Sequence, residues 1–286
     1  MNLRVRWRVF KALLRSPHPA GKKASLNPPR TLSIAKTLLG AFILPWWHRR
    51  TLFKALAAPG IALVSIDVVW CAFARSLSLA PFQGAFWAVW IVRSLLWLLF
   101  AVTVHRIILL QIRGNEVPTF PEWGRRETLF LAWAVAIYAL GTAAAFGAGL
   151  AIMTPFALVF STTFVEFAFP YVAAAITTYV LGRFLVMLPA IAIDRKITLG
   201  EAWALTRGNA LRMMVIVGAL PWAFSYLWYA IYGEDPSMIV VVLVTAVATV
   251  FMTVEIAALS LAYRELSAGQ PQPIDEAGAD VTSSGR

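Results

Sequence analysis

Six long apolar runs dominate the chain, and short polar connections separate them. The runs cover residues 52–73, 84–110, 128–151, 170–193, 209–232 and 237–263. As helices rising 1.5 Å per residue, all six can cross about 30 Å of hydrocarbon. They are too continuous for barrel strands, which alternate apolar and polar side chains over about ten residues. Backbone groups in lipid need internal partners. The pattern therefore predicts an all-α fold, a polytopic membrane helix bundle with about six transmembrane helices.

A shorter apolar stretch precedes the first run. At 17 residues, positions 31–47 fall short of the about 20 residues that a span needs. Leu39, Phe42 and Trp46 share one helical face with Leu32 and Ala35, which predicts an amphipathic helix lying in the membrane interface. The predicted organisation is a basic cytoplasmic tail at 1–30, an interfacial amphipathic helix at 31–50, a six-helix transmembrane domain at 51–266 and a disordered cytoplasmic tail at 267–286.

Short-range sequence signals predict the structure of two segments that connect the long apolar runs. Residues 154–169 are apolar but follow a complete span, so we expect an outer interfacial segment, with Pro170 starting the next helix. Thr198 and Glu201 have the spacing of a capping box, and Gly208 suits a helix end. These residues predict a short cytoplasmic helix at 199–207.

Composition agrees with the membrane interpretation. The chain is 60% hydrophobic and only 14% charged, whereas soluble domains have about 45–50% apolar and about 25% charged residues. An ordinary soluble protein is excluded. The single cysteine, Cys71, cannot form an internal disulfide.

Basic residues are distributed unevenly, which predicts orientation and partners. The net charge is +11, and twelve of the 25 Lys and Arg residues precede residue 55. With the N-terminus inside, the inner segments hold 22 basic residues and the outer loops hold one, so both termini are predicted to be cytoplasmic. The basic N-terminal segment is expected to attract anionic lipid headgroups. Nucleic-acid binding is the weaker alternative beside so much apolar sequence.

No catalytic or cofactor motif emerges from the sequence. The three histidines, His18, His48 and His105, lack a second histidine at ligand spacing. Nucleophile elbows, Walker loops and dinucleotide fingerprints are also missing from the sequence. We therefore expect no metal, no cofactor and no enzymatic activity, with an intramembrane enzyme as the third choice of function.

Four ionisable residues fall well inside the predicted spans. An Asp or Arg at the bilayer centre costs about 2.5–3.5 kcal/mol, so such groups normally find partners inside the bundle. Asp67 matches Arg93 in depth, and Glu255 matches Arg183. We expect two ion pairs that locate helices; the alternative is a path for protons or a solute.

Small residues recur on one face of the third run. Gly141, Ala145 and Gly149 are spaced four apart, a pattern that allows close helix packing in membranes. We expect this stripe to pack helices within the chain, and a dimer face is the alternative.

A motif spans the fourth connection. It comprises Arg183, Pro189, Asp194, Trp203, Thr206, Arg207, Gly208 and Asn209. It resembles the signature of a superfamily of bacterial six-helix integral membrane proteins, which includes the membrane domain of some glycerophosphodiester phosphodiesterases and the YciC-type inner-membrane proteins. The resemblance implies a multi-pass protein of the bacterial inner membrane. It does not imply phosphodiesterase activity, because this chain has no His-Arg-Gly catalytic start and no segment long enough for the soluble barrel.

These observations favour one function and leave another open. The favoured function is a non-enzymatic membrane protein, an accessory or assembly factor that interacts with lipid or a membrane-protein complex, or that forms a homo-oligomer. The alternative is a transporter or channel subunit for a small solute that uses the intramembrane carboxylates.

Overall fold

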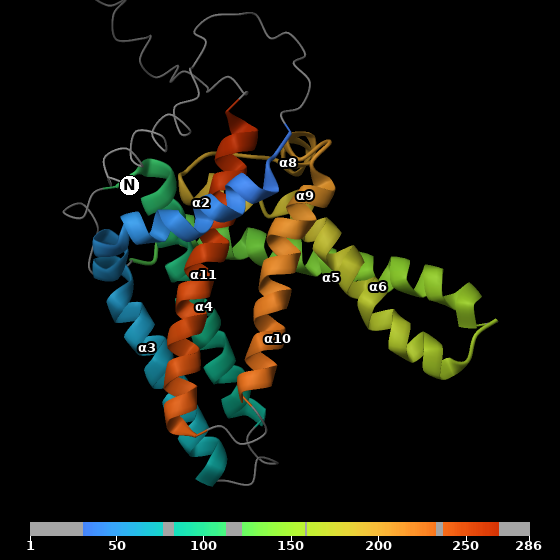
Figure 1. Ribbon diagram of the computed structural model, residues 1–286, viewed down its shortest axis with the longest axis horizontal. Coiled ribbons are helices and arrows are strands. Elements are labelled where there is room, and N and C mark those ends of the chain that lie inside the picture. The colour runs from blue at the N-terminus through green and yellow to red at the C-terminus, as the bar shows by residue number, and fades with distance from the viewer. Residues whose placement is uncertain (1–30, 77–82, 113–121, 158, 233–236, 269–286) are drawn as a thin grey trace, which may run out of the picture. The chain divides into compact units, whose positions relative to one another are not determined.

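The computed structural model describes residues 31–76, 83–112, 122–157, 159–232 and 237–268. Every secondary-structure element in these ranges is helical, which confirms the predicted fold class. The long helices are α3 (Arg49–Ser76), α4 (Gln83–Leu110), α5 (Arg125–Ala157), α6 (Thr162–Phe184) and α11 (Met238–Ser267) (Figure 1). The shorter ones are α2 (Ile34–Trp47), α7 (Met187–Ala192), α8 (Leu199–Leu205), α9 (Ala210–Met214), the π-helical η1 (Val215–Ala219) and α10 (Leu220–Tyr232). The predicted tail at 1–30, and all but Ser267 and Ala268 of the predicted tail at 267–286, lie outside the described residues.

Among the described residues, five helical stretches are long and apolar enough to cross a membrane. They are Arg49–Phe73, Gly84–Leu110, Arg125–Ala157, Thr163–Ala192 and Met238–Ser267. Large apolar side chains on their outer faces are exposed, among them Phe53 at 74% and Val69 at 66%. Lipid tails would cover such faces, as expected for a multi-pass membrane protein.

The fifth expected span, at 209–232, differs in detail from the prediction. Residues 210–232 are helical without a break, but a π-helical turn, η1, separates α9 from α10. The π-helical turn contains Gly218, where a Cβ atom would overlap the side chain of Thr178 on α6. Insertion of a π turn shifts the register of a helix locally. Hydropathy does not reveal such a contact, so the helix was predicted and its π turn was not.

The expected interfacial segment at 154–169 is also corrected. Instead of a separate segment, α5 continues to Ala157 and α6 begins at Thr162. The Ser161 hydroxyl accepts a hydrogen bond from the Phe164 amide at 3.3 Å, so Ser161 caps α6 and Pro170 lies inside the helix. The prediction gave the proline too much weight, because membrane helices tolerate proline in their interior.

Helices α5 and α6 form a hairpin along the predicted small-residue stripe (Figure 1). Gly141, Ala145 and Gly149 are buried. A Cβ on Gly149 would lie 3.1 Å from the ring of Phe169, and one on Gly141 would lie 3.5 Å from Leu181. The stripe therefore lies against α6 of the same chain.

Helix α2 packs across α11 through its small face (Figure 1). Thr37, Gly40, Ala41 and Leu44 are buried there. The predicted apolar face, with Leu39, Phe42 and Trp46, is exposed instead.

The buried core is concentrated where α4, α7 and α11 meet. Its fully buried members include Phe100 and Ile107 on α4, Met187 on α7, and Ala257 and Ala262 on α11.

Candidate functional site

Arg183 joins the end of α6 to α8. Its side chain is almost fully buried, with 4% of the residue exposed. The guanidinium donates a hydrogen bond of 2.8 Å to the Thr206 carbonyl, and its carbon lies 3.8 Å from the centre of the Trp203 ring. A cation over an indole face is attracted by the ring quadrupole. Three motif residues, Arg183, Trp203 and Thr206, thus form one junction.

The predicted capping box starts α8 in front of this junction. The Thr198 hydroxyl accepts from the Glu201 amide at 3.2 Å, and the Glu201 carboxylate accepts from the Thr198 amide at 2.6 Å. Hydrogen bonding to the Thr198 backbone, followed by bonding to its side chain, lowers the pKa of the Glu201 carboxyl. After the helix, Gly208 has a φ of 76°, a left-handed conformation that glycine adopts at little cost. The short helix is confirmed, and it ends at Leu205, two residues before the predicted end.

Asn209 connects the motif to the start of α2. It is 1% exposed, and its side-chain oxygen accepts from the Leu32 amide at 2.8 Å and from the Arg212 guanidinium at 3.1 Å. Its neighbour Arg207 is exposed. The motif therefore fixes the start of α2, a long-range contact that sequence spacing did not indicate.

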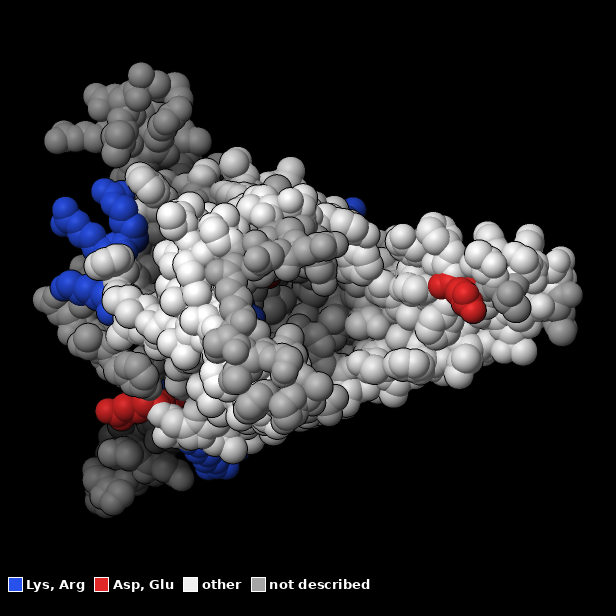
Figure 2. Space-filling model, turned by 90° about the horizontal axis from the view of Figure 1, so that it is seen from below, with Lys and Arg blue, Asp and Glu red and all other residues white. Residues whose placement is uncertain are grey.

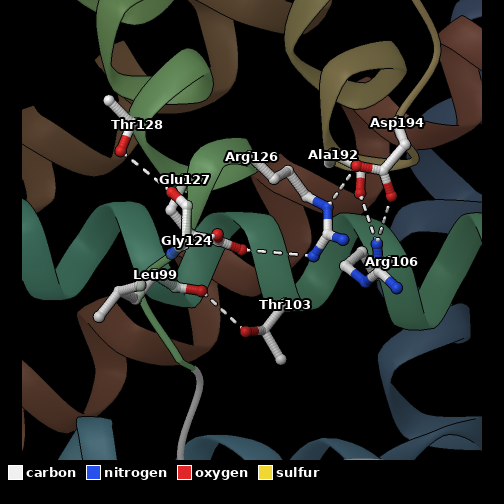
Figure 3. Close-up of polar contacts among 9 residues, drawn as sticks. All are labelled: Leu99, Thr103, Arg106, Gly124, Arg126, Glu127, Thr128, Ala192 and Asp194. Carbon is white, nitrogen blue, oxygen red and sulfur yellow. Dashed lines mark hydrogen bonds and ion pairs between the residues drawn. The ribbon is translucent and has the colours of Figure 1, made fainter.

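Asp194 forms salt bridges with two arginines from different helices (Figure 3). Its oxygens lie 2.8 Å from Arg126 Nε of α5 and 3.2 Å from Arg106 Nη1 of α4. Arg106 also donates to the Ala192 carbonyl at 3.2 Å. Burial alone would raise the pKa of the Asp194 carboxyl. The hydrogen bonds and positive charges of the two guanidinium groups have the larger effect, so this pKa lies below its ordinary value. Asp194 has a φ of 62°, and Pro189 before it is buried in α7.

Asp67 and Arg93 are brought together, as expected. Arg93 Nε lies 3.2 Å from a carboxylate oxygen of Asp67. The other oxygen accepts a hydrogen bond of 2.9 Å from the Thr245 hydroxyl of α11. This contact joins α3, α4 and α11, and sequence reasoning did not identify Thr245.

The second expected pair does not form. Arg183 contacts α8, whereas Glu255 is half-buried on α11 and makes no ion pair with another described residue. The prediction matched residues by depth alone, and equal depth does not make two helices neighbours.

His105 and Ser260 form a further buried contact, between α4 and α11. His105 Nδ1 lies 2.7 Å from the Ser260 hydroxyl oxygen, and both residues are almost fully buried. The Ser260 hydroxyl oxygen also lies 2.8 Å from the Ile256 carbonyl oxygen, and which of these two neighbours receives the serine proton depends on the tautomer of His105. The described residues contain no cluster of three His, Cys, Asp or Glu side chains that could hold a metal.

Comparison with known proteins gives no match: no protein-family model, no curated protein and no solved structure resembles this chain significantly. The helices and their exposed apolar faces are those of a multi-pass membrane protein.

Proposed function

We propose that this chain is a non-enzymatic accessory or assembly protein of the bacterial inner membrane, which interacts with lipid or with a larger membrane complex. One observation carries the proposal. Three ionisable side chains of the helix bundle, Arg183, His105 and Asp67, each contact another helix. Groups used in this way stabilise helix packing, as polar side chains do inside membranes.

Membership of the six-helix superfamily is part of the proposal. Support comes from the motif, whose Arg183, Trp203 and Thr206 form one junction and whose Asp194 forms another. A substitution at one of these residues would disturb its contact partners, so the same residues would recur across a family. Such a motif would be recognisable even if the members shared no reaction.

Both termini are proposed to be cytoplasmic. The support is the 22-to-1 distribution of basic residues between the inner segments and the outer loops. In this orientation the junctions around Asp194 and Asn209 lie near the inner membrane surface, together with α2.

Transport of a small solute is the competing function. It is favoured by Glu255, a half-buried carboxylate without an ion pair among the described residues. Intramembrane carboxylates are typical of proton and solute paths. The accessory role is favoured by Asp67, because both of its oxygens are already bound.

Two measurements on the full chain distinguish these functions. The protein would be extracted in native-lipid nanodiscs, and co-purifying lipids and proteins would be identified by mass spectrometry. In parallel, proteoliposomes would be tested for proton and solute flux, with Glu255→Gln as the variant and Glu265→Gln as the matched control. We expect a reproducible lipid or protein partner and no flux above empty liposomes. Flux that Glu255→Gln abolishes and Glu265→Gln leaves intact would contradict the proposal.

A further inference from the structure

The corner where α2 runs into α3 exposes large apolar side chains. Leu39 is 63% exposed, Trp46 is 68% exposed and Phe53 is 74% exposed, and Phe42 lies on the same face of α2. Contiguous apolar surface of this kind marks a contact with lipid or with another protein. We call these four residues the apolar face of the corner.

Buried contacts fix the opposite side of α2. The Leu32 amide binds Asn209, and the Thr37 hydroxyl lies 3.5 Å from the Glu265 carboxylate. A Cβ on Gly40 would lie only 2.9 Å from Leu261, so the lack of a side chain lets the helix approach α11 closely. Because one side of α2 is held in this way, its apolar face cannot turn inward.

Unpaired cations lie beside the apolar face. Lys36, Arg49, Arg50 and Lys54 are exposed, and none forms an ion pair with another described residue. Arg49 stays near the aromatic surface, with its guanidinium carbon 5.1 Å from the centre of the Trp46 ring. In Figure 2, basic side chains gather at the left end of the view, the end at which α2 meets α3 in Figure 1.

Every charged residue that α2 and the first four turns of α3 contribute to this corner is basic. The first acidic residue of the chain is Asp67, so neither α2 nor the first four turns of α3 contain a carboxylate. Arg50 and Lys54 are one helical turn apart and therefore project from the same side of α3. An anionic group lying between them would meet two cations and no repelling charge from these segments.

We infer that the α2–α3 corner is a binding site for the headgroup of an anionic phospholipid. Arg50 and Lys54 bind its phosphate, and the apolar face enters the adjoining acyl region. This proposal deepens the proposed function and rests on its assignment of the corner to a membrane surface. A membrane is favoured over nucleic acid as the occupant, because the cations directly adjoin exposed Trp, Phe and Leu side chains at the start of an apolar helix long enough to span. Interfacial helices combine basic and apolar faces in this manner.

The test measures lipid selectivity of the full chain in nanodiscs of phosphatidylcholine that contain 30% phosphatidylglycerol or none. Native mass spectrometry would compare how many molecules of each lipid the protein retains. The variant is Arg50→Gln with Lys54→Gln, and the matched control is Arg125→Gln with Lys196→Gln, which removes two exposed cations elsewhere. Each basic residue near an anionic surface contributes a factor of about five in affinity, so the corner variant should lose about 25-fold in selectivity.

A second measurement tests whether the apolar face enters the acyl region of the membrane. A nitroxide attached at Phe42→Cys, with Cys71→Ser in the background, should be accessible to oxygen and shielded from a water-soluble relaxation agent. Equal loss of selectivity in the variant and the control, retention of nucleic acid in place of phosphatidylglycerol, or an aqueous nitroxide would each overturn the lipid site. A transport activity or a reversed topology would overturn the proposed function and leave the selectivity for phosphatidylglycerol unchanged.

Discussion

Replacing Arg183 by glutamine tests the junction between α6 and α8. The change removes the guanidinium–carbonyl hydrogen bond, and bonds to charged groups contribute about 1.5–3 kcal/mol. Loss of the contact with the half-exposed Trp203 adds about 0.5–1 kcal/mol. Two effects reduce the loss: the Thr206 carbonyl keeps its bond from the Asn209 amide, and no buried carboxylate is left without a partner. We therefore expect Arg183→Gln to lower the free energy of unfolding by about 1–3 kcal/mol.

Double-mutant cycles identify the partner of Arg183. Unfolding free energies would be measured by denaturant titration in mixed micelles for Arg183→Gln, Trp203→Leu and their combination, and for Arg183→Gln with Glu255→Gln. The Trp203 cycle should give a coupling energy of about 0.5–1 kcal/mol. The Glu255 cycle should be additive within about 0.5 kcal/mol. A strong coupling to Glu255 together with additivity at Trp203 would refute the junction.

Three further predictions concern other contacts. Asp67→Asn and Arg93→Gln should show a coupling energy of about 0.5–3 kcal/mol in the same titration, and simple additivity would mean that the residues do not interact. The pKa of Asp194 is lowered by its arginines, so its contribution to stability should be complete above about pH 4 and disappear as pH falls through the folded-state pKa. The stability difference between the protein and Asp194→Asn should shrink on acidification, and a constant difference would contradict this reasoning. Gly218→Ala should destabilise the protein because the new methyl group overlaps Thr178, and Thr178→Ser should recover part of the loss by removing the facing methyl group. Failure of that rescue, measured by thermal unfolding, would exclude the proposed close contact.

Helices with local signals were predicted well from the sequence. Apolar runs of more than 20 residues predict long helices because backbone groups need internal partners in lipid. Thr198, Glu201 and Gly208 define α8 through contacts within a few residues. The same local reasoning failed at Pro170, where a membrane helix accommodates a residue that usually starts or breaks helices in water.

Contacts between distant segments could be predicted only in part. Asp67 and Arg93 lie on adjacent helices joined by a short connection, so matching depth was sufficient to pair them. Glu255 and Arg183 have other helices between them in the chain, and depth could not show which helices are neighbours. The cluster at Asp194 was missed for a related reason, since Arg106 and Arg126 are 88 and 68 residues away and carry no local signal of their convergence.

Membrane topology is the most direct test of the central claim, that this is a multi-pass membrane protein with both ends in the cytoplasm. Single cysteines at Lys36, Ser161, Lys196 and Ser237, each with Cys71→Ser, would be labelled in intact cells by a membrane-impermeant maleimide. We predict labelling at Ser161 and Ser237 before lysis, and at Lys36 and Lys196 only after lysis. Labelling of Lys36 and Lys196 in intact cells, with protection of Ser161 and Ser237, would contradict the claim.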